Sequence, residues 1–224
     1  MTNWRRLDNE RLATTSPIGL RLVDEFRAAP PVGAVRARLE IDDGGGSFRL
    51  LDIPAVMTPS SVLIYPGLGR AHDPANAPTR HYRVTLDADL YLPLYTATPL
   101  PVGTPDGLEF DAPPFDDVTP PAQPAVFVEV ALLPAPNYPF ESHYPVIHGI
   151  VEDLAGVRVP HALVTRGGQE RVLTDARGTF SLPLRWAQGP TTIDATDDAA
   201  RTGSISVDVN DPNQRDRNQT ITIN

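Results

Sequence analysis

Proline occurs so often in this chain that a mainly helical fold is excluded. The sequence of 224 residues contains 25 prolines and 16 glycines, and proline disrupts both helix interiors and central strands. The prolines must therefore lie mostly in the connections between short elements. Nearly half of them fall within residues 99–145, which predicts an irregular Pro- and Asp-rich insertion at 99–124 and a stiff linker at 136–145.

Charge is unevenly distributed along the sequence. The formal net charge is −9, and residues 84–157 contain eleven acidic side chains but neither arginine nor lysine. The field of such a segment repels phosphate groups and anionic lipids, so we expect no nucleic-acid partner and no membrane-surface role. The chain also lacks cysteine and lysine altogether. That composition removes thiol chemistry, cysteine-based metal sites and Schiff-base chemistry.

The first residues carry no sign of an export signal. Residues 1–16 contain three arginines among polar residues and no apolar run of the length that a secretory signal needs. Apolar stretches elsewhere are too short to span a bilayer, so we expect no membrane insertion. The expectation is a protein that is cytoplasmic at synthesis and that a particle could release later.

Residues 1–15 are predicted to form a helical arm. Thr2 or Asn3 can cap a short helix that runs to about residue 13, and its apolar side chains share one broad face. A helix this short is marginal alone and needs a surface to dock on. That surface is either its own domain or a neighbouring subunit. The partner-docking candidates of the arm are Trp4, Leu7 and Leu12.

From residue 18 onward, apolar and polar residues alternate with a period of two, which is typical of antiparallel strands. Strands are expected at 20–24, 35–41, 48–53, 61–65, 81–90 and 125–133. Residues 16–135 are therefore predicted to form a β-sandwich domain that carries the long insertion at 99–124. The insertion is acidic and exposed by this prediction. It contributes four further docking candidates, Asp111, Phe115, Asp116 and Asp117.

Residues 146–224 contain a second series of short strands, expected at 148–153, 159–164, 170–173, 204–209 and 219–223. The segment 174–182 has the most specific local chemistry. Asp175 can accept hydrogen bonds from the backbone amides that follow it, and Gly178 can take a positive φ. Phe180 and Leu182 then fall on the same face of a restarting strand.

This second unit resembles the carboxypeptidase regulatory-like domain, a transthyretin-like β-sandwich of seven strands. The resemblance covers residues 146–224, about a third of the chain, and Val157 departs from it where the family often has proline. It implies a non-catalytic domain used for stability, spacing or interaction. The matching residues are Gly149, Val151, Gly156, Ala162, Val164, Thr174, Asp175, Gly178, Phe180 and Leu182.

The predicted fold class is all-β, with two tandem Ig-like or transthyretin-like β-sandwich domains and a short N-terminal helix. The domains are residues 16–135 and 146–224, and the Pro-rich linker 136–145 holds them at a restricted angle. A weak internal similarity leaves open whether the first domain is a diverged duplicate of the second.

Few residues of the sequence have the type and spacing of a catalytic or metal-binding site. The five histidines lack metal-site spacing, and no Gly-x-Ser-x-Gly elbow occurs. Weak calcium candidates are Asp208, Asn210 and Asp211, which faintly resemble the calcium linker of cadherins. The same residue types are ordinary in β-turns, and we prefer that interpretation. No cofactor is expected.

The favoured function is a non-enzymatic structural or adaptor protein of a larger assembly, by analogy with the tandem sandwiches of phage tails and contractile injection particles. Its partners would be other protein subunits of that assembly, and a homo-oligomer is left open. The alternative is a carbohydrate- or calcium-dependent adhesive binding module that uses loops such as residues 42–46. A hydrolase is the third hypothesis, and no catalytic constellation supports it.

Overall fold

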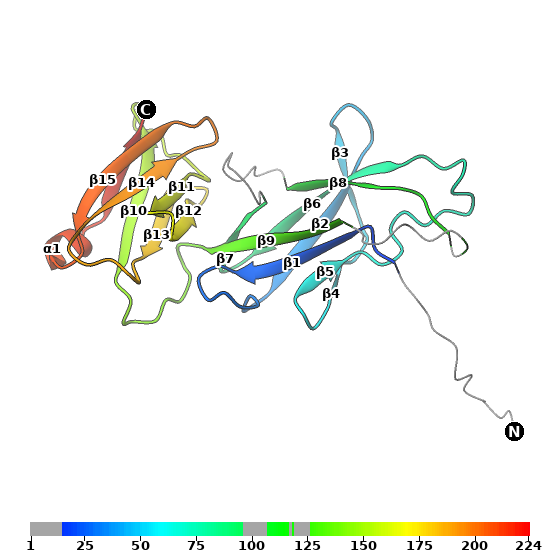
Figure 1. Ribbon diagram of the computed structural model, residues 1–224. Coiled ribbons are helices and arrows are strands. Elements are labelled where there is room, and N and C mark those ends of the chain that lie inside the picture. Colours follow the sequence, from blue (N-terminus) through cyan, green and yellow to red (C-terminus); the bar gives the residue numbers. More distant parts are fainter. Residues whose placement is uncertain (1–14, 96–106, 117, 119–125) are drawn as a thin grey trace, which may run out of the picture.

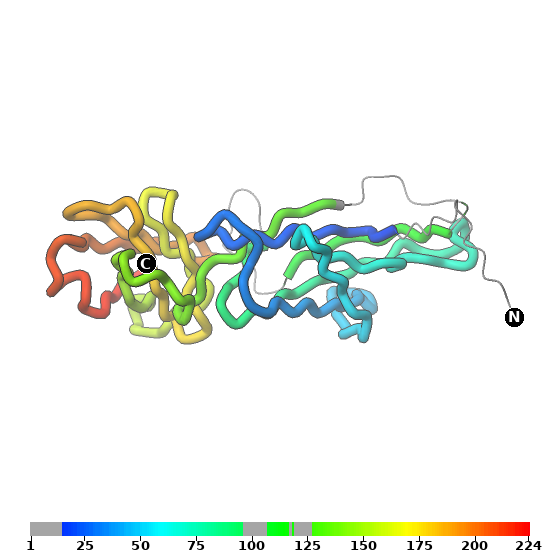
Figure 2. The backbone as a smooth tube through the Cα atoms, turned by 90° about the horizontal axis from the view of Figure 1, so that it is seen from below, coloured from blue at the N-terminus to red at the C-terminus, as the bar shows by residue number. Residues whose placement is uncertain are grey.

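The computed structural model describes residues 15–95, 107–116, 118 and 126–224, and it confirms the all-β prediction. Strands make up 49% of the structure and helix about 2%. The chain forms an elongated molecule in which an N-terminal unit and a C-terminal unit lie end to end (Figures 1 and 2). No helix in the described ranges is long and apolar enough to cross a membrane.

The N-terminal unit is built on one nine-stranded sheet. The strand order is β3-β2-β6-β7-β9-β1-β5-β4, and β8 pairs with β6 off this path. Among the described strands of this sheet, only β1 and β9 pair in parallel. The strands are β1 (Ile18–Asp24), β2 (Val35–Asp42), β3 (Phe48–Leu51), β4 (Val56–Met57), β5 (Val62–Ile64), β6 (Arg80–Ala88), β7 (Tyr91–Leu94), β8 (Leu108–Ala112) and β9 (Val126–Pro134).

A single curled sheet replaces the two facing sheets that were predicted for residues 16–135. The sheet curls into a half-barrel, so its concave side encloses a core without a second sheet. Leu20, Leu22, Val84 and Leu132 project into this core and are at most 1% exposed. Alternation along a strand determines which side chains face inward. It does not determine whether the covering layer is another sheet or the same sheet bent round.

The insertion expected at 99–124 contains a strand. β8 alternates between inward Phe110 and Ala112 and outward Glu109 and Asp111, and it pairs antiparallel with β6. The high proline content on either side of this segment hid a short period-2 pattern. β8 therefore belongs to the sheet rather than to an irregular excursion.

The C-terminal unit consists of two sheets around a common core. One sheet has the order β13-β10-β16 and the other β12-β11-β14-β15. Buried side chains from both sheets meet between them, among them Val151, Phe180, Ile193 and Ile221. The elements are β10 (Val146–Asp153), β11 (Leu163–Arg166), β12 (Glu170–Leu173), β13 (Thr179–Pro183), β14 (Pro190–Thr196), β15 (Thr202–Asp208), α1 (Pro212–Arg215) and β16 (Gln219–Ile223).

The turn before β13 has the geometry predicted from the sequence. The Asp175 carboxylate accepts hydrogen bonds from the backbone amides of Arg177 and Thr179, both at 2.9 Å. Gly178 has a φ of 71°, and a Cβ there would lie 2.9 Å from the carbonyl oxygen of Val151. The turn therefore requires both the carboxylate and the glycine.

The strand expected at 159–164 begins later than predicted. His161 has a φ of 55°, which is turn geometry, and β11 starts only at Leu163. The Thr174 hydroxyl accepts a hydrogen bond from the amide of Ala162 and donates one to the carbonyl of Val159, both at 2.8 Å. The Thr174 side chain thus adds to the backbone hydrogen bonds that residue 174 makes with His161 and Ala162.

Candidate functional site at the junction of the two units

The best-defined polar and aromatic site of the described chain lies where β1 ends. Asp24, Glu25 and Phe26 follow one another in sequence but make contacts in different directions. Asp24 continues the inward face of β1 and is fully buried in the N-terminal unit. Glu25 and Phe26 contact the C-terminal unit instead. These three residues therefore join the two units.

Asp24 ties the linker to the N-terminal core. Its Oδ2 accepts hydrogen bonds from the hydroxyls of Tyr91 at 3.0 Å and Tyr138 at 2.8 Å, and its Oδ1 accepts one from the amide of Arg27. Burial raises the pKa of both tyrosine hydroxyls, so they remain protonated donors. Because Tyr138 belongs to the predicted linker 136–145, that segment is packed onto the domain and is not a free spacer.

Glu25 forms a two-pronged ion pair across the junction. Its carboxylate accepts hydrogen bonds from Nε of Arg171 at 2.5 Å and from Nη2 of the same residue at 2.7 Å. Parallel bonds of this kind fix the relative orientation of the two groups as well as attracting them. The pair therefore sets how β12 of the C-terminal unit sits against the end of β1.

Phe26 lies at the centre of an aromatic cluster at the same junction. Its ring packs edge-on against Tyr138, Phe140 and Tyr144, with ring centroids 5.1 to 5.7 Å apart. The guanidinium of Arg185 lies 4.7 Å from the ring centroid, and its Nη1 donates a hydrogen bond to the carbonyl of Phe26 at 2.6 Å. A cation over an aromatic face adds electrostatic attraction to the packing.

A buried carboxylate holds Arg185 in place. Glu170 is 2% exposed, and it accepts hydrogen bonds from the backbone amides of Arg185 and Trp186. Its other oxygen pairs with Nη1 of Arg166 at 3.2 Å. The buried charge is thereby matched by three donors, and the turn that carries Arg185 is fixed.

Leucines form the apolar part of the junction. Leu94 and Leu133 from β7 and β9 pack against Leu163 and Leu173 from β11 and β12, and all four are buried. A small cavity at the polar side of the junction, lined by Glu25, Phe26, Arg171 and Arg185 among others, has a volume of about 10 Å³, about enough for a single water molecule. The junction is therefore a packed contact between two units and not a ligand pocket.

The docking candidates from the sequence are scattered. Phe115 is only 6% exposed and bonds through its backbone to residues 69 and 71, so its ring is a packing residue of this chain. Asp116 accepts a hydrogen bond from the amide of Val118. Trp4, Leu7, Leu12 and Asp117 lie outside the described residues.

Asp111 belongs to a histidine-centred acidic cluster on β6 and β8. It is paired with His81 on the neighbouring strand. The Nδ1 atom of His81 lies 2.8 Å from the Asp111 carboxylate, and its Nε2 atom lies 3.1 Å from the Glu109 carboxylate. These hydrogen bonds, that of Asp111 first, raise the pKa of His81, and burial opposes the shift. A protonated imidazole can donate to both carboxylates at once.

We expect His81 to titrate above the ordinary histidine value of about 6.5. Asp111→Asn should lower its pKa more than Glu109→Gln does, as measured by NMR of the imidazole protons. Because the folded pKa is raised, the stabilisation by this cluster is complete below the unfolded pKa and is lost as pH rises through the folded value. Titration at or below the ordinary value would show that the contacts do not form in solution.

The weak calcium candidates lie between the end of β15 and the start of α1. The Asp208 carboxylate accepts a hydrogen bond from the amide of Asn210, and Asp211 accepts one from Asn213 as the helix cap, both at 2.9 Å. Nowhere in the described ranges do three or more histidine, cysteine, aspartate or glutamate side chains gather as a metal site would need. Turn formation accounts for these oxygen atoms.

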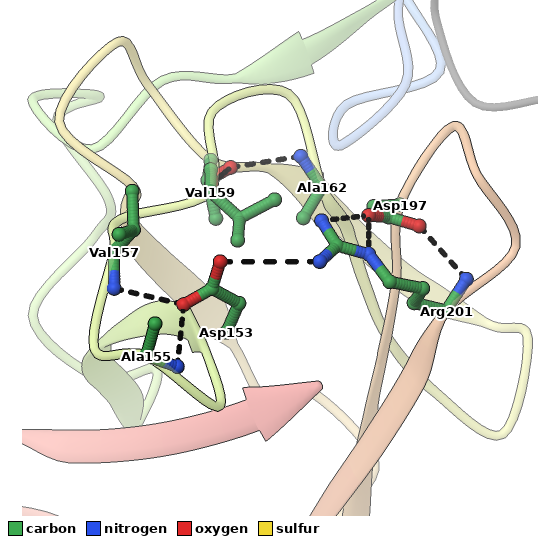
Figure 3. A network of polar contacts seen from close by, with 8 residues as sticks. Asp153, Ala155, Val157, Val159, Ala162, Asp197 and Arg201 are labelled. Atoms are coloured by element: carbon green, nitrogen blue, oxygen red, sulfur yellow. Dashed lines mark hydrogen bonds and ion pairs between the residues drawn. The ribbon is translucent and has the colours of Figure 1, made fainter. Parts of the chain in front are cut away.

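Two further carboxylates shape one end of the C-terminal unit (Figure 3). Asp197 is 3% exposed and accepts hydrogen bonds from the amide of Arg201 at 2.8 Å and from its Nε at 2.7 Å. Asp153 accepts bonds from the amides of Ala155 and Val157 and lies 3.9 Å from the Arg201 guanidinium. The network links two turns and leaves the guanidinium anchored by both carboxylates.

Sequence reasoning missed the junction, although one signal for it was present. Leu20, Leu22 and Asp24 occupy alternate positions of one strand, so an acidic residue stands on an otherwise apolar face. Buried carboxylates need donors, and two tyrosines supply them here. Comparisons with known proteins add nothing to this site, because no protein-family model, no curated protein and no solved structure matches the chain.

Proposed function

We propose that this chain is a non-enzymatic structural or adaptor subunit of a larger protein assembly, in which it acts as a rigid two-unit spacer. The observation that carries the proposal is the packed junction between the units. Domains joined only by a linker move relative to one another by default. Here the four buried leucines, the Glu25–Arg171 pair and the Arg185–Phe26 contact oppose such motion.

The C-terminal unit supports the same proposal through its resemblance to the carboxypeptidase regulatory-like domain. Seven strands in sheets of three and four agree with the sandwich that the resemblance implies. Packing requires glycine at position 149, since a Cβ there would lie 2.6 Å from the Phe180 ring. As a non-catalytic spacing domain, this unit would extend the molecule without adding chemistry.

The setting that we propose is a phage-tail-like or contractile injection particle, by analogy of architecture. Such particles are built from subunits that hold one another at fixed distances. An elongated chain whose two units are locked together suits that task. The proposal predicts that the native protein sediments with high-mass particles from cells that express it. A freely sedimenting monomer in such lysates would contradict it.

Leu163→Asp is expected to separate the two units, because it places an unpaired carboxylate in the apolar part of the junction. We expect a larger radius of gyration by small-angle X-ray scattering and a loss of about 2 kcal/mol in the free energy of unfolding. Leu154→Asp is the matched control, since Leu154 lies in the same unit and is 78% exposed. An unchanged radius for Leu163→Asp would show that the junction does not restrain the units.

A further inference from the structure

An apolar patch lies on the outer face of the N-terminal sheet. The strand register places Phe127, Gly19, Ile64 and Val56 in one row across β9, β1, β5 and β4. Phe127 is 60% exposed and Val56 is 46% exposed. We call Phe127, Val62, Ile64 and Val56 the outer patch.

Glycine at position 19 shapes this patch. A Cβ on Gly19 would lie 3.2 Å from the Phe127 ring and 3.4 Å from the side chain of Val62. The phenyl ring therefore leans over β1 rather than standing clear of the sheet. The result is a low apolar surface that runs across several strands, onto which a partner's apolar side chains can pack.

The outer patch continues a face that already serves as an interface. Outward positions of β9 alternate from Phe127 through Glu129 and Ala131 to Leu133, and the last two pack in the leucine cluster of the junction. The Arg21–Glu129 ion pair, at 3.5 Å, separates the covered end from the open end. One end of this face thus binds the C-terminal unit, and the other lies at the far end of the same strands (Figure 1).

Residues 1–14 join the described chain at Thr15, close to this patch. They precede β1, whose Gly19 stands between Phe127 and Ile64 in the row. The chain is held at this point, because the carbonyl of Thr15 accepts from the amide of Gly67 at 2.8 Å and the Ser16 hydroxyl accepts from the amide of Tyr65 at 3.0 Å. These bonds hold Thr15 and Ser16 beside the end of β5.

The length of the segment is sufficient to reach another molecule. Fourteen residues span about 20 Å as a helix and up to about 46 Å when extended. The sequence predicts an apolar helix face made of Trp4, Leu7 and Leu12, and such a face needs a surface to dock on. The outer patch is an exposed apolar surface at the place from which the segment starts.

We propose that the outer patch binds residues 1–14 of a second copy of this chain, with Trp4, Leu7 and Leu12 packed on Phe127, Val62, Ile64 and Val56. Each copy carries both an arm and a patch, so exchange of arms produces a closed homo-oligomer. This inference rests on the proposed function as an assembly subunit, for which it names one contact. It needs no other protein.

Purified full-length chain tests the proposal by light scattering coupled to size exclusion over a range of concentrations. We expect the wild-type chain to form an oligomer. Deletion of residues 1–14 and the substitution Phe127→Asp should each weaken self-association by about 30-fold or more, as expected for loss of a central anchor. Val157→Asp is the matched control, since Val157 is also 60% exposed but lies on the C-terminal unit. Circular dichroism establishes that every variant is folded.

Mixing the two defective variants gives the decisive result. The truncated chain keeps its patch and Phe127→Asp keeps its arm, so together they should form a one-to-one complex that neither forms alone. A truncated chain that still self-associates would overturn the proposal, as would a wild-type chain that stays monomeric with Trp4 buried against its own patch. Association of the purified chain and sedimentation in native particles are separate measurements, so this inference and the proposed function can fail independently.

Discussion

Glu170→Ala is expected to lower the free energy of unfolding by about 3 to 5 kcal/mol, the cost of breaking a buried charged pair. The substitution removes an acceptor that is 2% exposed and leaves the guanidinium of Arg166 and two backbone amides without it. Glu170→Gln should be milder, because its amide oxygen can still accept from the backbone. Urea unfolding followed by circular dichroism measures both values.

Glu109→Ala provides the control for Glu170. The Glu109 side chain is 48% exposed in its contact with His81, and exposed ion pairs contribute at most about 1 kcal/mol. If the two substitutions lower the free energy of unfolding by the same amount, the hydrogen bonds of Glu170 are not what stabilises the turn at Arg185. A selective loss would instead show that one buried carboxylate supports both the C-terminal unit and its contact with Phe26.

The sequence predicts the strands better than it predicts their assembly. Period-2 alternation places β1, β2 and β6 nearly where the structure has them, because the pattern reflects which side of each strand meets apolar neighbours. The alternation does not tell which element covers the apolar side of the strand. A curled sheet and a sandwich bury the same residues, so the architecture of the N-terminal unit does not follow from its sequence.

Proline had two effects on the prediction. It marked the connections correctly as non-helical, but its density around β8 concealed a strand whose inward residues are Phe110 and Ala112. It also indicated a stiff linker at residues 136–145. The structure packs Tyr138 and Phe140 of this linker against the N-terminal core, because aromatic rings between the prolines bring apolar surface that the domain can bury.

The residues that pair across the junction could not be found from local patterns, since they are far apart in sequence. Glu25 and Arg171 are 146 residues apart, and neither belongs to a recognisable motif. Charged residues in a strand-rich chain are ordinarily solvated. Only the chain's three-dimensional path brings these two together, whereas the turn around Asp175 is encoded within a few residues and was predicted.

Asp24→Ala should lower the free energy of unfolding of the N-terminal unit by about 2 to 4 kcal/mol. Two buried tyrosine hydroxyls and the amide of Arg27 lose their acceptor, and each unpaired buried donor costs about 1 to 3 kcal/mol before any relaxation. Asp24→Asn keeps an acceptor oxygen and should cost less. Urea unfolding of the three proteins measures the order.

A double-mutant cycle with Tyr138→Phe tests whether the loss comes from these hydrogen bonds. In the wild-type chain, Tyr138→Phe removes a donor to Asp24, whereas in the Asp24→Ala background it removes a hydroxyl that no longer has this acceptor and should cost much less. Additive effects would mean that the two groups act independently. Strong coupling would make Asp24 the residue through which the linker is held to the core, and proteolysis within residues 136–145 should then be faster in Asp24→Ala than in the wild type.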